Sequence, residues 1–202
     1  MKRLLALLVL PVLLPLLLAG CANVRMIDAQ VQAIATTSPI EPGARYRFER
    51  LPSQVDQPRS AQVEAIAQVA LAQVGLVRND SAARYSALLG SRVQSYMADN
   101  WGNPLGAPGG SYGQIIIGTG NTGSRVGFGL GMGFPPPTWY RHEVSLLLRD
   151  LGSNQVVYET RAFHDGPWSD SDRILPALFE AALKDFPKPP AGVRRINIEI
   201  PR

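Results

Sequence analysis

The stretch Ile115–Gly123, IIIGTGNTG, contains the spacing G-x-G-x-x-G. Between a strand and a helix, this spacing lets the backbone approach a pyrophosphate, which the N–H groups at the helix start then bind. The run Ile115–Ile117 fits a strand, but glycines alternate through residues 127–133 and three prolines follow, a composition that cannot hold a helix. A P-loop lysine is missing as well. We therefore expect no dinucleotide or other cofactor.

The two histidines, His142 and His164, are a second candidate. A hairpin turn centred near Ser153 would place them opposite each other, and cross-strand imidazoles at that separation could share a metal ion. Asp165, Asp170 and Asp172 are close in sequence, but turn and helix-cap roles account for them. Since no third ligand can be placed, we expect no metal site, and a small-ligand or metal-binding periplasmic module remains an alternative.

Nucleophilic catalysis would need an activated serine or cysteine. The chain has no G-x-S-x-G, and Ser169 or Ser171 beside His164 and Asp165 is the one triad that can be imagined. Helix capping explains these serines more simply. We expect no catalytic residues and no enzyme, with a hydrolase as the least favoured alternative.

The residues Leu18-Ala19-Gly20-Cys21 form the sharpest motif, and Cys21 is the chain's only cysteine. The motif resembles the lipobox of bacterial lipoproteins. This resemblance implies a diacylglycerol thioether on Cys21, cleavage before it, and a further acyl chain on the new amino terminus. Stable anchoring needs more than one acyl chain, a condition that such a cysteine meets.

The residues before Cys21 have the pattern of a secretory signal, with Lys2 and Arg3 ahead of a leucine-rich core. The core is short for a membrane span, and Pro11 and Pro15 interrupt it. By the sorting rules of such lipoproteins, Ala22 after the cysteine indicates the outer membrane, with the protein facing the periplasm. Without Lys2 and Arg3, 18 of the 20 basic residues remain against 16 acidic ones, so we expect no nucleic-acid partner.

Hydrophobic periodicity predicts the elements that would position these residues. Strands are expected at 45–51, 85–97 and 195–200, a hairpin at 142–162, and helices at 60–74 and 169–186. Ser60 is expected to cap the first helix and Gly75 to end it; Ser169 with Asp172 resembles a capping box, and Pro176 should start or kink the second helix. This order indicates an α+β fold: a mostly antiparallel sheet with two helices packed on one face, preceded by a signal peptide and tether.

The domain organisation follows from composition. We expect a signal peptide at 1–20, a lipidated N-terminus and tether at 21–43, and one periplasmic domain at 44–202. A loosely held first strand is the alternative to a tether within 22–43. The domain includes a Gly/Pro-rich excursion at 99–137, which holds 12 of the 19 glycines. Aromatic residues that could meet a partner cluster around it: Trp101, Tyr112, Phe128, Phe134, Trp139 and Tyr140.

The chain also resembles a family of bacterial lipoproteins, domain of unknown function 4136, over about residues 44–200. The resemblance rests on YRFERLP at 46–52, the helix from Ser60, the Gly/Trp-rich middle, HEVSLLLRDLGSNQVVYETRAFHDGPWSDS at 142–171, and ILPALFEAALKDFP at 174–187. It implies an envelope lipoprotein with one small α+β domain, and it supplies no catalytic residues. Taken together, we expect a non-enzymatic, outer-membrane-anchored periplasmic lipoprotein that binds or scaffolds an envelope protein or glycan.

Overall fold

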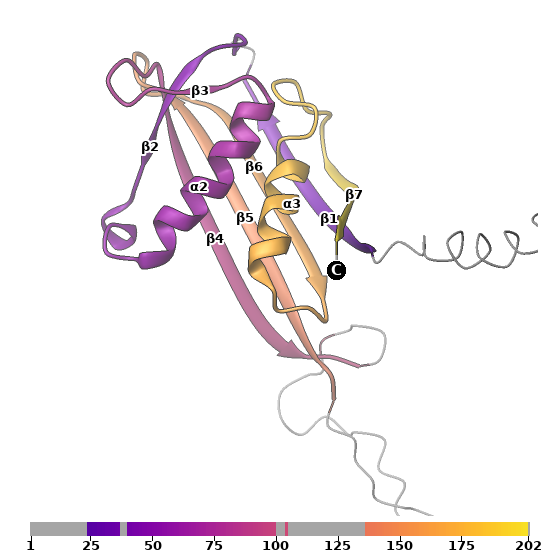
Figure 1. Cartoon of the computed structure of the whole chain (residues 1–202). Coiled ribbons are helices and arrows are strands. Elements are labelled where there is room, and N and C mark those ends of the chain that lie inside the picture. Colours follow the sequence, from indigo (N-terminus) through magenta and orange to yellow (C-terminus); the bar gives the residue numbers. More distant parts are fainter. Residues whose placement is uncertain (1–23, 37–39, 100–103, 105–135, 202) are drawn as a thin grey trace, which may run out of the picture.

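The computed structural model describes residues 24–36, 40–99, 104 and 136–201. Seven strands form one mixed sheet in the order β3-β2-β4-β5-β6-β1-β7, and two helices cover one face of it (Figure 1). The strands are β1 Val24–Ala35, β2 Arg45–Glu49, β3 Val77–Arg78, β4 Tyr85–Met97, β5 Thr138–Asp150, β6 Val156–Gly166 and β7 Val193–Pro201; the helices are α2 Pro58–Gln73 and α3 Ser171–Ala182, with a short 3₁₀ helix η1 at Pro52–Gln54.

The α+β class and the mostly antiparallel sheet are confirmed. The strands β4, β5, β6, β1 and β7 pair antiparallel with one another in that order. The sheet is not purely antiparallel, because β2 runs parallel to both β3 and β4. The connection from β2 through α2 returns the chain to the same end of the sheet, as parallel neighbours require.

The predicted tether is wrong for Val24–Ala35, which form β1 in the interior of the sheet. This strand pairs with β6 on one side and with β7 on the other. Its alternate residues Ile27, Ala29, Val31 and Ala33 are buried beneath the helices. The folded domain therefore starts at Val24 and not at residue 44, because these side chains complete the core.

The hairpin of β5 and β6 has the predicted register. His142 pairs with His164 and Leu148 with Tyr158, before a shift at Arg149. The Asp150 carboxylate accepts hydrogen bonds from the backbone N–H groups of Gly152 and Ser153, each 2.9 Å long. Asn154 takes a positive φ of 58°, which asparagine tolerates better than most residues.

Helix α2 starts two residues before the predicted cap. Its first residue is Pro58, and the Ser60 hydroxyl donates to the Gln54 carbonyl instead of capping the helix. Gly75 ends the helix as predicted, with a φ of +86° that glycine adopts without a steric cost.

Helix α3 starts at Ser171, so the predicted capping box of Ser169 and Asp172 is wrong. The Asp172 carboxylate accepts a hydrogen bond from Gln62 on α2. Pro176 lies inside the helix and not at its start, with its ring on the exposed side. The apolar side of α3, including Ile174, Leu178 and Phe179, is fully buried against the sheet. This packing holds the helix together despite the proline.

Candidate functional site

Several of the predicted functional residues lie outside the described part of the chain. These are Cys21 with the signal segment, IIIGTGNTG, and the aromatic residues Trp101, Tyr112, Phe128 and Phe134. Cys21 is nevertheless located in sequence, three residues before the start of β1 at Val24.

The two histidines lie opposite each other on β5 and β6, on the face that the helices cover. His142 is fully buried and His164 is 5% exposed. The Nε2 atom of His142 lies 3.0 Å from the Trp168 carbonyl, and Nδ1 of His164 lies 3.0 Å from the Asp28 carbonyl. A carbonyl only accepts, so these two nitrogens carry the protons in the neutral rings.

Each imidazole consequently keeps one unprotonated nitrogen. Nδ1 of His142 and Nε2 of His164 are buried and have no hydrogen-bond partner. Burial lowers the pKa of His142 below its ordinary value of 6.5, and the neighbouring His164 lowers it further, against the opposing effect of the Trp168 carbonyl. The pair is therefore a buried site in which one nitrogen of each ring has no hydrogen-bond partner.

Trp168, Arg25 and Asp170 pack together beside the histidine pair, where β6 ends. Trp168 stacks on His164 with 6.1 Å between the ring centroids, and the Arg25 guanidinium lies 5.3 Å from the Trp168 ring. Arg25 also donates to both carboxylate oxygens of Asp170, at 2.8 and 2.7 Å. Gly166 leaves the room that His164 needs, since a Cβ there would lie 2.7 Å from Nε2 of His164.

The structure does not assemble the triad considered from sequence. Asp165 follows His164 on β6, so its side chain points to the opposite face of the sheet. There it accepts hydrogen bonds from Arg141, at 2.9 and 2.8 Å, and from Tyr96 at 3.1 Å. Ser169 is exposed, and the His164 N–H is directed to the Asp28 carbonyl.

The aspartates near the histidines in sequence do not supply a third metal ligand. Asp170 is paired with Arg25, and Asp172 with Gln62. Within the described ranges, no three His, Cys, Asp or Glu side chains group closely enough to hold a metal ion. The histidine pair can accept a proton or offer two nitrogen ligands, and among the described residues no general acid or nucleophile contacts the two free nitrogens.

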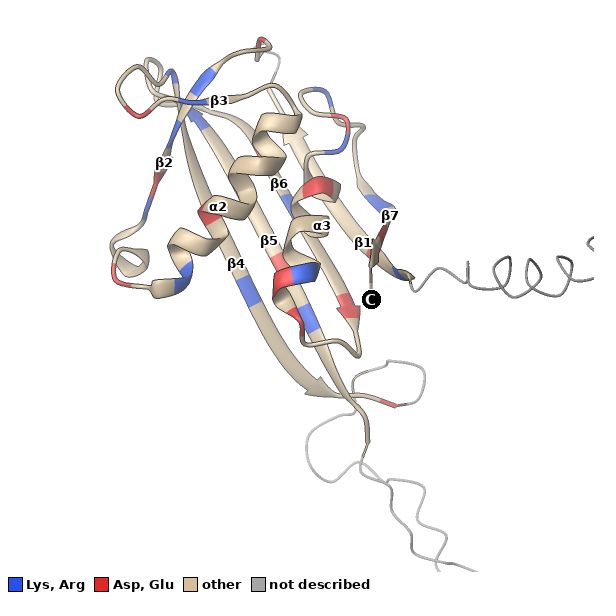
Figure 2. Cartoon of the chain, in the orientation of Figure 1, with Lys and Arg blue, Asp and Glu red and all other residues tan. Residues whose placement is uncertain are grey.

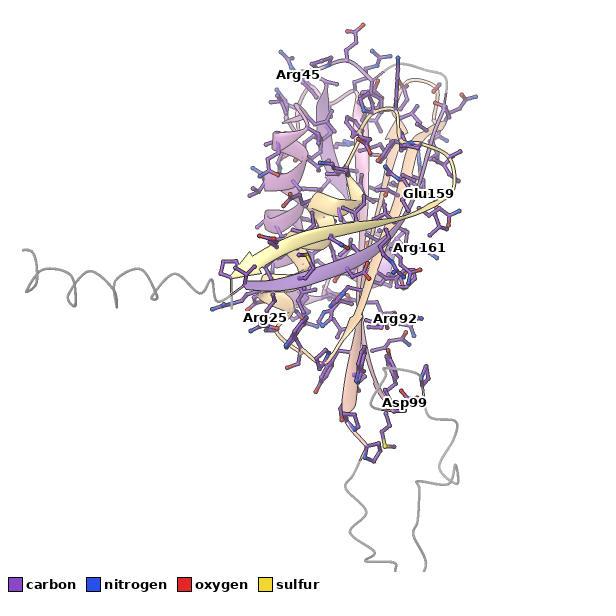
Figure 3. All side chains as sticks on the ribbon, turned by 90° about the vertical axis from the view of Figure 1, so that its right-hand side faces the viewer. Arg25, Arg45, Arg92, Asp99, Glu159 and Arg161 are labelled. Carbon is purple, nitrogen blue, oxygen red and sulfur yellow. The ribbon has the colours of Figure 1, made fainter. Side chains whose placement is uncertain are left out.

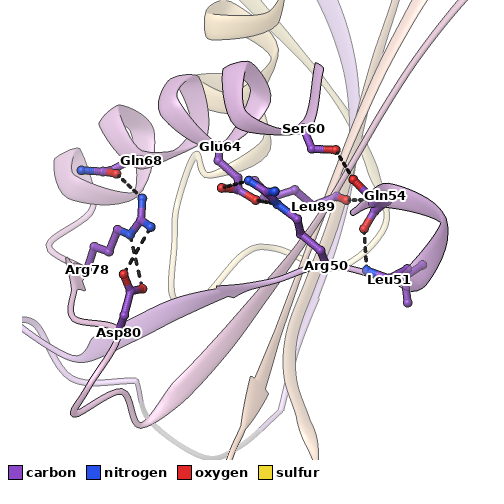
Figure 4. A network of polar contacts seen from close by, with 9 residues as sticks. All are labelled: Arg50, Leu51, Gln54, Ser60, Glu64, Gln68, Arg78, Asp80 and Leu89. Atoms are coloured by element: carbon purple, nitrogen blue, oxygen red, sulfur yellow. Dashed lines mark hydrogen bonds and ion pairs between the residues drawn. The ribbon is translucent and has the colours of Figure 1, made fainter. Parts of the chain in front are cut away.

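A polar network joins β2, η1, α2 and β4 (Figure 4). Arg50 pairs with Glu64, while Gln54 donates to the Leu89 carbonyl at 2.8 Å and accepts from the Leu51 N–H at 2.9 Å. The cavity beside it encloses about 90 Å³. That volume suits a few water molecules and is well below the size of a typical small-molecule pocket.

A larger, open hollow of about 550 Å³ lies between α2 and α3. Its floor is apolar, with Ile66 and Ala70 beside the exposed Val69, and Asp172 and Glu180 lie on its rim. The sequence analysis did not predict this hollow, although Ala65 and Val69 are apolar residues on the outer side of α2.

The face of the sheet away from the helices is polar. Figure 3 shows Arg92, Glu159 and Arg161 on that side. Arg161 forms an ion pair with Glu143 at 3.1 Å. A second cross-strand ion pair on this face joins Arg141 and Asp165. In the view of Figure 2, basic and acidic residues are interspersed along the elements of the described domain.

No protein-family model matches the chain, and no curated protein matches it in sequence. Its fold is similar to solved structures at low identity. A single-substitution variant of the PelC dodecamer from Paraburkholderia phytofirmans is 15% identical with a TM-score of 0.42, and the PelC dodecamer of the same organism is 12% identical with a TM-score of 0.43. Each match covers 77% of this chain and 94% of the PelC chain.

A PDZ domain protein from Parabacteroides distasonis is also similar in fold. It is 12% identical with a TM-score of 0.49, and the match covers 88% of this chain and 39% of that protein. These likenesses are distant, so function has to be argued from the chain's own residues.

Proposed function

We propose that this protein is a bacterial envelope lipoprotein, anchored through acyl chains on Cys21 in the outer membrane and facing the periplasm. Its α+β domain would bind or scaffold an envelope protein or glycan without catalysing a reaction. The observation that carries the proposal is the sequence Leu18-Ala19-Gly20-Cys21 at the end of a leucine-rich segment with a basic start.

The position of the folded domain supports this proposal. The first strand starts three residues after Cys21, where a mature lipoprotein domain would begin. Among the described residues, no helix is long and apolar enough to span a membrane.

The domain offers surfaces on which a partner could bind. Two broad surfaces are available, the polar face of the sheet and the apolar hollow between α2 and α3. A photo-reactive residue at Arg161 on the first surface and one at Val69 on the second would be crosslinked in intact cells. A specific adduct at one position identifies the binding surface, and its mass distinguishes a protein from a glycan.

The anchor is tested by replacing Cys21 with serine. We expect Cys21→Ser to remain an uncleaved precursor that takes up no labelled fatty acid, because the thiol is the acyl acceptor. Ala22→Asp is the matched control: it should be acylated and cleaved but move to the inner-membrane fraction. Cleavage and acylation of Cys21→Ser would refute the lipoprotein proposal, and an unchanged location of Ala22→Asp would refute the sorting.

A metal- or small-ligand-binding role is the second candidate, and the two unpartnered histidine nitrogens favour it. In metal sites the ligating imidazole commonly donates its other N–H to a carbonyl or carboxylate, as both rings do here. Calorimetric titration with Zn²⁺ of the domain and of His142→Gln and His164→Gln tests this role. Binding that both substitutions weaken at least tenfold would support it, and binding unaffected by both would exclude this site.

A further inference from the structure

The spacing between the lipid anchor and the folded domain is short. From Cys21 to Val24 the chain advances three residues, which span at most about 11 Å when fully extended. The first residues of β1 cannot extend this distance, because Val24 and Arg25 pair with Pro201 and Ile200 of β7. An acylated Cys21 would therefore keep the start of β1 close to the bilayer.

Several element ends lie at this end of the sheet, among them the end of β4 and the start of β5. Since β1 runs antiparallel to β6 and β7, its start lies at the same end of the sheet as the end of β6 and the end of β7. Helix α3 begins five residues after β6 ends, at this same end (Figure 1). The β5–β6 turn around Ser153 lies at the other end, roughly 40 Å away along the strands.

The side chains at this end suit a lipid interface. Val24 and Met26 are 38% and 46% exposed, and Pro167 and Pro201 are exposed as well. Trp168 is partly buried and carries the Arg25 guanidinium over its ring. Tryptophan and arginine favour the headgroup region, where an apolar body and a polar tip are both satisfied.

Charges of both signs lie at this end: the exposed Glu199 is opposite Met26 in the strand register, and the exposed Arg173 donates to the Pro201 carbonyl. Arg25 is paired with Asp170, and Arg195 with Asp28 at 3.3 Å. Neither pair leaves a net charge that a phospholipid surface would repel. The polar face of the sheet differs, because its arginines and carboxylates would have to be desolvated against a bilayer.

We propose that the membrane-facing end, formed by Val24, Arg25, Met26, Pro167, Trp168 and Pro201, rests on the phospholipid surface that holds the acyl chains of Cys21. The domain stands end-on, with the Ser153 turn pointing away into the periplasm. This inference rests on the proposed acylation of Cys21. In this orientation, the polar face of the sheet and the hollow between α2 and α3 lie at the sides of the domain, where partners can reach them.

The experiment uses the full-length acylated protein in vesicles of phosphatidylethanolamine and phosphatidylglycerol. Because acylation occupies the only natural cysteine, one added cysteine gives a single nitroxide site. Labels are placed at Ser169 and Met26 on the membrane-facing end, at Ala65 on α2, and at Ser153 on the far turn. Collision rates with lipid-dissolved oxygen and with a water-soluble nickel complex report the environment of each label.

We expect the ratio of oxygen to nickel collisions to be several-fold higher at Ser169 and Met26 than at Ser153 and Ala65. Equal, water-like ratios at all four positions would overturn the orientation, as would a higher ratio at Ala65, which would put α2 on the membrane. A mobility loss at Ser169 without oxygen access would show a bound protein and also overturn it. Mass spectrometry before labelling separates these results from failure of the anchor: a chain without acyl mass refutes the proposed function itself.

Discussion

At the scale of single residues, the histidine pair shows how position decides chemistry. His142 and His164 were expected to face each other, and they do, but each N–H is used by a main-chain carbonyl. The neighbouring Asp165 cannot assist His164, because successive residues of a strand point to opposite faces. The pair therefore holds separate segments together: β5 to the Trp168 loop, and β6 to β1.

The buried His142 should make stability depend on pH. Its pKa is lowered in the folded state by burial, so the unfolded chain binds the proton more tightly and acid favours unfolding. We expect stability to be fully present above pH 6.5 and to fall as the pH decreases below that value towards the lowered pKa.

Urea unfolding between about pH 8 and about pH 5, a range that brackets the titration of histidine, measures this dependence. His142→Gln keeps an N–H donor for the Trp168 carbonyl and does not titrate, so its stability should fall less steeply over the same range. Equal slopes for the two proteins would show that another group causes the dependence.

Gly166 is a residue at which a methyl group should be costly. Its Cβ would lie 2.7 Å from Nε2 of His164, whose ring is held between the Asp28 carbonyl and Trp168. We expect Gly166→Ala to lower the free energy of unfolding by about 1–3 kcal/mol in urea unfolding, as overpacking of a buried site does. Ser169 in the loop that follows β6 is exposed, so Ser169→Ala should change the free energy of unfolding by less than about 0.5 kcal/mol.

At the scale of elements, α3 contains Pro176, a residue that is unfavourable inside a helix. Pro176 has no N–H for the carbonyl of Asp172, yet the helix continues from Ser171 to Ala182 because its apolar side is buried. The end of α3 is also held by the sheet, since the hydroxyl groups of Thr160 and Tyr158 both donate to the Ala182 carbonyl, at 2.8 and 3.3 Å. Tertiary packing thus offsets a local preference.

Replacing Pro176 by alanine should therefore stabilise the domain. The substitution restores a helical hydrogen bond at an exposed position, and part of that gain is lost because the unfolded chain becomes more flexible. We expect Pro176→Ala to raise the free energy of unfolding by about 1–2 kcal/mol, measured by thermal or urea unfolding. Pro167→Ala outside the helix is the control, and a destabilised Pro176→Ala would mean that the ring itself packs favourably at the hollow beside α2.

At the scale of the whole molecule, β1 decides where the domain begins. It lies between β6 and β7, so the edge strand β7 has no other partner in the described sheet. A chain that starts at Val24 should fold, whereas one that starts at Ala44 loses a central strand and the pairing of β7.

Circular dichroism during urea unfolding would measure the difference between these two chains. We expect a single cooperative transition for residues 24–202 and none for residues 44–202. A cooperative transition in the shorter chain would show that β2–β6 and the two helices form a sufficient core without β1.

Much of this fold follows from local patterns in the sequence. Alternation of polar and apolar residues predicted the strands β4 and β7. The turn residues around Ser153 predicted the register of His142 with His164. Both features depend on neighbours along the chain. Gly75 likewise marked a helix end by its own conformational freedom. The motif Leu18-Ala19-Gly20-Cys21, on which the lipoprotein proposal rests, is also entirely local.

The remaining features of the fold were decided by the tertiary structure, because they depend on contacts between segments that are distant in sequence. The alternation IDAQVQAIA at 27–35 fits a strand, yet only pairing with both β6 and β7 makes it interior to the sheet. The parallel pairing of β2 and the start of α3 were settled in the same way. The element ends that lie beside Val24 were likewise set by strand order, which burial of the whole core selects and no single segment specifies.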